Sequence, residues 1–382
     1  MLIIYQIASS IKGDRAIWAS FLLLCLVGLL AVYSTAGALT WQDRGISTTS
    51  YFLSHLLHVL IAIGLAYFCH RLHYRYYQKV GYFLMLVSVP LLVLTLAMGR
   101  SVNEASRWLE LPFLPFGFQT SDIAKLALII YVAQKLTQKQ EYIQSFKEAF
   151  MPIIVPVILI CGLIAPANLS TAIILFFTCV VLMFIGRVHY RYILLLMLLG
   201  IVTMALLIFI GNVAPDLVRV DTWISRLNTF LHEESGGYQV EQAKIAIARG
   251  GLLGVGPGNS LSRNYLPYSQ NDFIFPIICE EYGLLGGLLV VWLYVMLFLR
   301  TVVLVTRSPK VFGAFLAIGL SLMITIQAIT NIAVSVHLVP TTGLTLPFIS
   351  KGGTSMIFSA ISLGIILSVS RYIEKLDEIA KS

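Results

Sequence analysis

The sequence predicts an all-α polytopic membrane protein, from its composition, its long apolar segments and the distribution of its basic residues. Of the 382 residues, 58% are hydrophobic and only 12% are charged, whereas soluble domains are about 45–50% apolar. A formal net charge of +8 can indicate nucleic-acid binding, but basic residues also gather in the cytoplasmic loops of membrane proteins. The composition therefore favours a membrane protein with no nucleic-acid partner.

Six strongly apolar segments are close to the length of about 20 residues that a helix needs to cross a bilayer. They are residues 16–36, 52–69, 80–98, 192–213, 273–299 and 311–336. The first is longer than the apolar core of a signal peptide, which is about 7–15 residues. It is therefore predicted to be a retained first helix.

Three weaker segments complete the predicted bundle. Residues 123–133 are entered through Asp122 and Lys125, which predicts a span whose outer end faces a polar cavity. Residues 151–185 are too long for one span and contain a Pro-Ala-Asn break at 166–168, which predicts a tight helical hairpin. Residues 355–369 are short but uncharged. The total is about ten transmembrane helices.

The basic residues predict the orientation of these helices. With ten spans, sixteen of the 26 Lys and Arg residues fall on the side of the termini and ten on the other side. By the positive-inside rule, both termini are cytoplasmic. Residues 213–271 then form one large extracytoplasmic loop between spans seven and eight. This insert is too short and too rich in glycine for a core of its own, so residues 1–382 are predicted to be a single domain.

Asp272, at the end of this loop, is the candidate reactive group. Pro276 is tolerated only in the first turn of the following helix, so Asp272 lies at or near the helix N-cap, and its simplest explanation is that cap. Glu280 favours another explanation, because it lies on the same helix stripe about 12 Å deeper. A carboxylate at that depth needs pairing, protonation or water, which implies a wet cavity beneath Asp272. Glu281 is expected to be the structural partner of a neighbouring helix.

Several cations lie on the side that should contain few of them. Arg107 and Lys125 flank the fourth predicted span, and Lys351 precedes the tenth. Such an excess favours an anionic ligand, for which phosphate is the natural choice. Trp108, beside Arg107, is by itself typical of an interfacial aromatic residue.

Two other patterns resemble ligand sites but are weaker. The stretch RGGLLGVGPGNS at 249–260 has no preceding strand and no GK[ST] sequence, so a tight re-entry at the membrane surface is favoured over a nucleotide loop. His55 and His58 lack a third ligand and are expected to be buried, hydrogen-bonded histidines. No metal site is predicted.

Six motifs resemble the SEDS family (shape, elongation, division and sporulation), which contains FtsW, RodA and SpoVE. They are RWL at 107–109, S-D-x-A-K at 121–125, PANLSTA at 166–172, GVGPGNS at 254–260, NDFIFPIICEEYG at 271–283 and LPFISKGGTS at 346–355. Their identity, order and position relative to the spans agree with that family, and most with its division-type FtsW branch. Many members have Glu at the position of Asp122, Asp at that of Ala167 and Tyr at that of Lys351, so Asn168 is given no catalytic role.

The resemblance implies a peptidoglycan glycosyltransferase. Such an enzyme polymerises lipid II into glycan strands at the outer face of the bacterial cytoplasmic membrane during cell division and releases undecaprenyl diphosphate. The resemblance also implies that Asp272 is essential. The expected partners are lipid II, the nascent glycan strand, a class B penicillin-binding transpeptidase of the FtsI type and other divisome membrane proteins.

Residues and resemblance together suggest one reaction. Asp272 acts as the general base toward the acceptor 4-hydroxyl group, because a diphosphate leaving group needs charge stabilisation more than protonation. The candidate contacts with the pyrophosphate are Arg107, Lys125 and Lys351. Trp108 is expected to pack on the sugar or the prenyl chain, Glu280 to tune the cavity, and Ser350 to contact the substrate. A divalent cation such as Mg²⁺ or Mn²⁺ could bridge Asp272 and the pyrophosphate, although the sequence contains no evident cage for it.

Two other functions are compatible with the sequence. A lipid II flippase would also need a wet cavity and broken helices, but it would place ionisable residues near the middle of the membrane, whereas these gather at one face. A non-catalytic divisome scaffold would tolerate replacement of Asp272.

Overall fold

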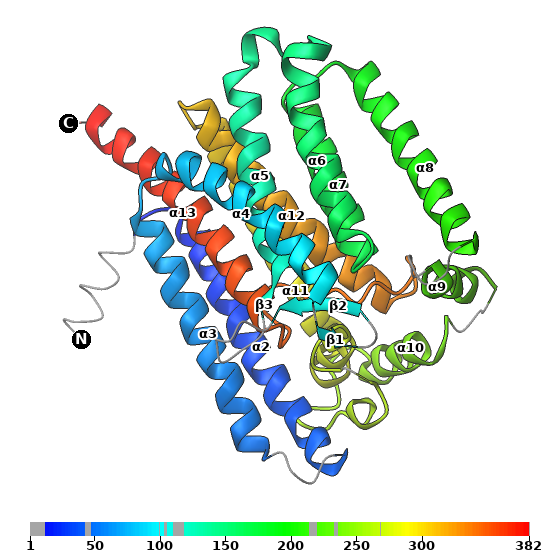
Figure 1. Ribbon diagram of the computed structural model, residues 1–382. Coiled ribbons are helices and arrows are strands. Elements are labelled where there is room, and N and C mark those ends of the chain that lie inside the picture. Colours follow the sequence, from blue (N-terminus) through cyan, green and yellow to red (C-terminus); the bar gives the residue numbers. More distant parts are fainter. Residues whose placement is uncertain are drawn as a thin grey trace.

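Long helices make up most of the chain, as its apolar segments predict (Figure 1). The computed structural model describes residues 12–42, 47–98, 100–102, 105–109, 118–213, 220–232, 236–267 and 269–381. Its helices are α2 (Arg15–Gln42), α3 (Thr48–Arg71), α4 (Tyr76–Met98), α5 (Thr120–Gln138), α6 (Met151–Ile164), α7 (Leu169–Ile185), α8 (Tyr190–Val213), α9 (Val220–His232), α10 (Tyr238–Gly250), α11 (Ile274–Thr306), α12 (Val311–Ser335) and α13 (Thr354–Lys381). Short 3-10 or π-helical turns lie at Gln140–Tyr142, Phe146–Phe150 and Ser262–Asn264.

Seven helices of the described residues are long and apolar enough to cross a membrane. They are Arg15–Gly37, Thr48–Arg71, Tyr76–Ala97, Phe146–Ile164, Ile274–Thr306, Val311–Ser335 and Thr354–Ala380. Two further apolar helices, Leu169–Ile185 and Tyr190–Thr203, are shorter. A helical multi-pass membrane protein is therefore confirmed, while the count of ten spans and the place of the large loop among them stay predictions.

The predicted hairpin within residues 151–185 is confirmed. α6 ends at Ile164, and the side chain of Asn168 caps α7 by accepting a hydrogen bond from the Thr171 N–H at 3.2 Å. The last span is much longer than the uncharged segment 355–369, because α13 continues through a charged stretch to Lys381.

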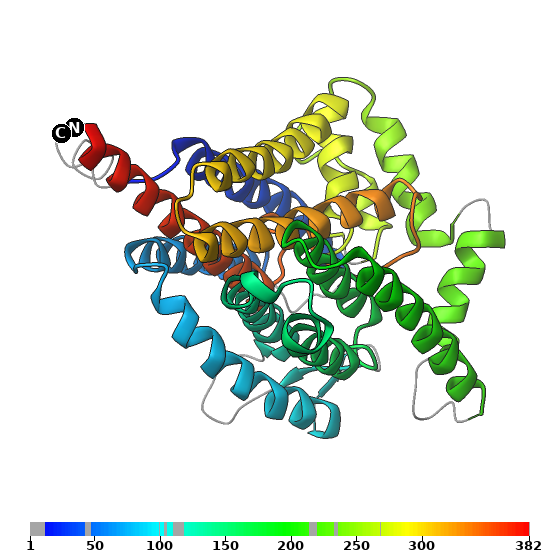
Figure 2. The same cartoon turned by 90° about the horizontal axis from the view of Figure 1, so that it is seen from above.

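α12 occupies the centre of the bundle (Figure 2). It packs against α5, α7, α11 and α13, and small residues allow the close approach. At Gly319, a Cβ atom would lie 2.9 Å from side-chain atoms of both Ile129 and Leu182. α8, by contrast, lies at the edge of the bundle against α7 and α9.

Two segments expected to be loops contain regular structure. The connection between α4 and α5 forms a small antiparallel sheet of β1 (Arg100–Val102), β2 (Ala105–Leu109) and β3 (Phe118–Gln119). The insert 213–271 contains α9 and α10. The predicted spans rest on long apolar runs, and neither the short strands nor the amphipathic helices α9 and α10 contain one.

The two ends of the bundle contain different features, with ion pairs of the first and last segments at one end and the strands, α9 and α10 at the other. Lys12 forms a salt bridge with Glu378 at 3.0 Å, so the first and last described segments meet at one end. Arg300 pairs with Asp14 at the same end, and Arg371 donates to the Arg71 carbonyl oxygen. The three strands, α9 and α10 lie at the other end (Figure 1). This arrangement agrees with the predicted partition of the basic residues.

Candidate functional site

Asp272 lies directly before Phe273, the N-cap residue of α11. The side chain of Phe273 itself supplies no capping hydrogen bond. Pro276 falls in the first turn, as predicted. Asp272 is half-buried, and its carbonyl oxygen accepts a hydrogen bond from Asn331 Nδ2 at 2.8 Å. Asp272 thus lies one residue before the N-cap, close to the position predicted for it, and the role of its carboxylate stays a prediction.

The segment before α13 holds the backbone on the N-terminal side of Asp272. The Lys351 N–H donates to the Gln270 carbonyl oxygen at 3.0 Å. The Ser350 hydroxyl group donates to the Asn271 carbonyl oxygen at 2.5 Å and accepts from the Leu346 N–H at 2.8 Å. Ser350 is only 2% exposed, so it supports the loop that carries Asp272. This differs from the predicted role of Ser350 as a substrate contact.

Two amides of α12 complete this support and were not found from the sequence. Asn331 Nδ2 also donates to the Leu344 carbonyl oxygen at 2.6 Å, and Gln327 Nε2 donates to the Thr345 carbonyl oxygen at 2.9 Å. The two residues are four apart and share one face of the helix. Buried amides inside an uncharged span are unusual, and that signal could have identified both.

Lys125 faces a partly polar cavity at the start of α5. Its Nζ atom lies 2.8 Å from Asp122 Oδ1, and the Thr354 hydroxyl group donates to Asp122 Oδ2 at 3.3 Å. The cavity, of about 350 Å³, is also lined by Gln327 and by Ser359 of α13. A partly polar cavity thus lies at the start of α5, and that this end of the span is the outer one stays a prediction.

Arg107 and Trp108 lie in β2, and the structure describes their backbone but not their side chains. Trp108 pairs with Gln119 of β3, and the Gln119 N–H donates to Thr354 Oγ1 at 3.3 Å. Backbone contacts therefore link β2 to the segment that contains Lys351. The roles of both side chains remain predictions.

Lys351 is a half-buried cation that rests on an aromatic ring. Its Nζ atom lies 2.8 Å from the centroid of the Tyr51 ring and 3.5 Å from the Tyr51 carbonyl oxygen. Burial lowers the pKa of Lys351 to about 8. Among the side chains that the structure describes, no carboxylate forms a salt bridge with it. A cation without a counter-charge is suited to an anionic ligand.

Glu280 was expected to line a wet cavity, but its carboxylate is buried and hydrogen-bonded to the glycine-rich loop. It is fully buried, and its carboxylate accepts hydrogen bonds from the Ser260 hydroxyl group and from the N–H groups of Leu261 and Ser262. Arg249 approaches to 3.7 Å. Glu280 thus fastens the end of the glycine-rich loop to α11 and does not line an open cavity beneath Asp272.

Glu281 is a structural partner of a neighbouring helix, as predicted. It accepts a hydrogen bond from the Ser34 hydroxyl group of α2. Arg263 Nη1 donates to the Ser34 carbonyl oxygen at 2.8 Å. The two adjacent glutamates therefore join α2, α11 and the loop between α10 and α11.

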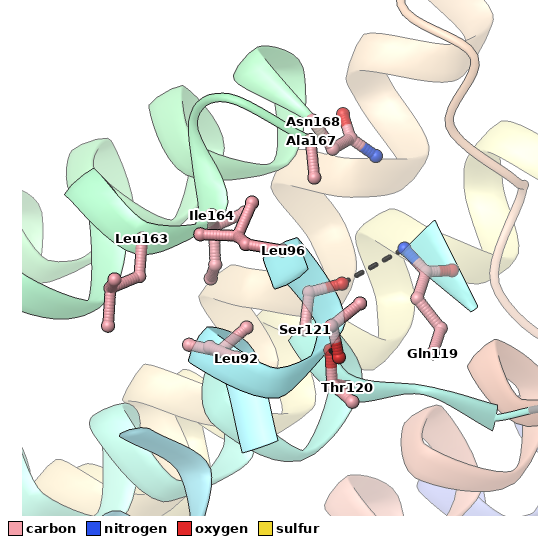
Figure 3. A pocket seen from close by; sticks show the side chains of 10 residues that line it. Leu92, Leu96, Gln119, Thr120, Ser121, Leu163, Ile164, Ala167 and Asn168 are labelled. Carbon is pink, nitrogen blue, oxygen red and sulfur yellow. Dashed lines mark hydrogen bonds between the residues drawn. The ribbon is translucent and has the colours of Figure 1, made fainter. Parts of the chain in front are cut away.

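A second cavity lies beside the first turn of α5 (Figure 3). Its volume is about 270 Å³, and Leu92, Leu96 and Ile164 form apolar walls. At its polar end, Gln119 Nε2 donates to Ser121 Oγ at 2.9 Å. Two cavities of different polarity therefore flank the start of α5.

No group of three or more His, Cys, Asp or Glu side chains within the described ranges is arranged to hold a metal ion. The five cysteines are free and buried, as expected for small core residues.

Comparison with known proteins gives one consistent result. The model of the FtsW/RodA/SpoVE family, described as "Cell cycle protein", matches residues 14–375. A probable peptidoglycan glycosyltransferase FtsW of Coxiella burnetii is 34% identical over 374 residues, which cover 96% of this chain and 98% of the relative.

Solved structures show the same fold. A chain from "Structural coordination of polymerization and crosslinking by a peptidoglycan synthase complex" superposes with a TM-score of 0.72 at 22% identity, covering 94% of this chain and 98% of that one. The rod shape determining protein RodA of Thermus thermophilus gives a TM-score of 0.68 at 22% identity, covering 95% and 98%.

Proposed function

This chain belongs to the FtsW/RodA/SpoVE family of cell cycle proteins, and on that basis we propose that it is a peptidoglycan glycosyltransferase. Relatives that bear this name match nearly the whole chain. Lipid II is the substrate that is polymerised: a sugar hydroxyl group is the acceptor, and a sugar linked to undecaprenyl diphosphate is the donor. The product is a longer glycan strand, and undecaprenyl diphosphate is released.

One observation supports the placement of this reaction at Asp272. The loop that carries Asp272 is hydrogen-bonded to Ser350 and Lys351, and Thr354, three residues further on, is hydrogen-bonded to the Asp122–Lys125 pair. A short run of backbone thus connects Asp272 with the cation Lys351 and with the ion pair of Asp122 and Lys125. A base beside a cationic surface is what glycosyl transfer from a diphosphate requires.

In the proposed step, Asp272 accepts the proton of the acceptor 4-hydroxyl group. The oxygen attacks the anomeric carbon of the lipid-linked donor, a C–O bond forms, and the bond from that carbon to the phosphate oxygen breaks. The diphosphate leaves with the bonding electrons, and Lys125, Lys351 and Arg107 stabilise its negative charge. Trp108 packs against the sugar or the prenyl chain.

The cellular setting follows from the same proposal. Undecaprenyl-linked donors are membrane lipids, so the site faces the outer surface of the bacterial cytoplasmic membrane and both termini are cytoplasmic. The division-type role is favoured because several relatives are named FtsW. The structural likeness to a peptidoglycan synthase complex supports a class B penicillin-binding transpeptidase as partner.

The decisive test is polymerisation of labelled lipid II by purified protein, alone and with the cognate transpeptidase. Asp272→Asn should lower the polymerisation rate by about 10²–10⁴-fold, because that is the usual contribution of a general base. Glu241→Gln is the matched control, since Glu241 is exposed on α10 of the same insert. Wild-type glycan ladders from Asp272→Asn would refute the assignment.

The same preparations separate the alternative functions. If neither protein forms ladders with the partner present, while both move lipid II across liposome bilayers, the protein is a transporter. If Asp272→Asn also recruits and activates the transpeptidase normally and neither protein polymerises, the protein is a scaffold.

A further inference from the structure

α11 is interrupted at Gly283, where the backbone adopts φ 70° and ψ −172°. The glycine-rich loop after α10 fills the interruption. The N–H groups of Val255 and Gly256 donate to the carbonyl oxygens of Glu280 and Glu281 at 2.9 and 3.0 Å. In the other direction, the Leu284 N–H donates to the Gly251 carbonyl oxygen at 2.9 Å. The loop therefore pairs the backbone groups that the break in α11 would otherwise leave without partners.

Glycine is required on both sides of this contact. A Cβ atom on Gly254, whose φ is +84°, would lie 2.2 Å from the Glu281 carbonyl oxygen. A Cβ atom on Gly283 would lie 2.2 Å from the Leu252 carbonyl oxygen. Only chains without side chains at these positions can approach so closely, so the loop and the helix behave as one rigid unit.

The tip of this loop presents two leucines outward. Leu252 is 69% exposed and Leu253 is 79% exposed. Their neighbours across the contact, Leu284 and Leu285, are 47% and 58% exposed. The tip is therefore continuous with the outward apolar face of α11, a candidate membrane span.

The length of α11 places this tip relative to the bilayer. Arg300 lies 16 residues after Leu284 and pairs with Asp14 at the basic end of the bundle. At 1.5 Å per residue the separation along the axis is about 24 Å, and any tilt reduces the depth it covers. The hydrocarbon core is about 30 Å thick. If Arg300 marks one boundary of that core, the level of Leu284 falls inside the opposite leaflet.

We propose that Leu252 and Leu253 form a re-entrant tip that inserts among lipid acyl chains in the leaflet on the side of Asp272. Two observations favour lipid over water around the tip. The tip is continuous with the exposed apolar face of α11, and the N–H groups of Gly251, Gly254, Val255 and Gly256 are paired within the protein, as hydrocarbon demands. Through Glu280, the inserted tip would also set the height of α10 and of the start of α11. This proposal is independent of glycosyl transfer.

The test is site-specific labelling of Leu253→Cys with an environment-sensitive maleimide fluorophore in the full-length protein. All five native cysteines are buried, so the new thiol on the exposed tip reacts selectively. The labelled protein is reconstituted into phosphatidylcholine vesicles with and without doxyl-labelled lipids. We expect blue-shifted emission and a loss of intensity with doxyl lipid that matches the loss at Leu288→Cys, which lies one turn further along the exposed face of α11.

Glu241→Cys is the aqueous control, because Glu241 is exposed at the other end of α10. If fluorescence at position 253 is unquenched and resembles that at position 241, the tip lies in water or contacts another protein, and the proposal is wrong. Normal elution of all three variants in gel filtration, as expected for substitutions at exposed positions, ensures that the comparison reports on location.

Discussion

For single side chains, the main finding is that Asp272 is positioned through its backbone. Asn331 holds its carbonyl oxygen, while Ser350 and Lys351 hold the two preceding residues. Two of these donors are the neutral side chains of Asn331 and Ser350, and the third is the backbone N–H of Lys351. A carboxylate can act as a base only when its distance to the acceptor is fixed, so these neutral groups should matter for rate.

We expect Asn331→Leu to reduce polymerisation with little change in the KM for lipid II. The substitution leaves the carbonyl oxygens of Asp272 and Leu344 without their donor, at a cost of about 1–3 kcal/mol for a buried group. Steady-state kinetics and thermal unfolding in detergent would measure both effects. Thr330→Ala is the control, because Thr330 bonds only within its own helix, to the Ile326 carbonyl oxygen. A similar loss of kcat in Thr330→Ala would contradict a positioning role.

Lys351 predicts a dependence of substrate binding on pH. Burial lowers its pKa to about 8, so the ammonium group is charged below pH 8 and becomes neutral as the pH rises through 8. If it binds the diphosphate, the KM for lipid II should rise between pH 7 and 9, by about tenfold for loss of one charge-assisted contact. Tyr51 and His55 of α3 are titratable groups close to Lys351 and could contribute to the same pH dependence.

Lys351→Arg provides the control for this prediction. Arginine keeps its charge across the whole range and can stack on the Tyr51 ring, so its KM should stay flat with pH. An unchanged pH dependence in Lys351→Arg would show that another group titrates.

Among the elements, α11 and the loop 250–256 approach so closely that neither Gly254 nor Gly283 has room for a Cβ atom. Gly283→Ala should lower the free energy of unfolding by more than about 2 kcal/mol. It adds the strain of a positive φ to a backbone clash with Leu252. Thermal unfolding in detergent is the measurement.

Gly162→Ala in α6 is the matched substitution, because a Cβ atom there meets nothing within 4 Å. In a helix interior, alanine should be neutral or stabilise by up to about 1 kcal/mol. Equal melting temperatures for the two variants would mean that the contact at Gly283 adapts and the two elements are not rigidly joined.

For the whole molecule, charge and helix packing agree on which ends lie together. Lys12 meets Glu378, so the described ends of the chain share one side of the bundle. The excess of Lys and Arg on that side predicts that it is cytoplasmic. A green fluorescent protein fused to the C-terminus should therefore fluoresce, and a Cys at position 241 should react with an impermeant maleimide in intact cells once the outer envelope is opened. The reverse pattern would invert the topology and place Asp272 inside the cell.

The sequence by itself determined the membrane class, the existence and approximate limits of the apolar helices, the hairpin at 166–168 and the family. These features depend on local composition, since a bilayer imposes a length and an absence of charge that can be read along the chain. Asp272, Lys125 and Lys351 were also identifiable as candidates, because ionisable residues are rare inside membrane segments and basic residues are scarce on the extracytoplasmic side.

Contacts between segments far apart in the sequence decided which partner each buried polar group has. Glu280 and Glu281 have the same local sequence environment, yet one fastens the loop after α10 and the other bonds to α2. Asn331, Ser350 and the glycines of the loop acquire their roles only where α12, α11 and the segment before α13 meet. Pairing of buried polar groups is a property of three-dimensional neighbours, so no pattern along one segment could reveal which partner each group would find.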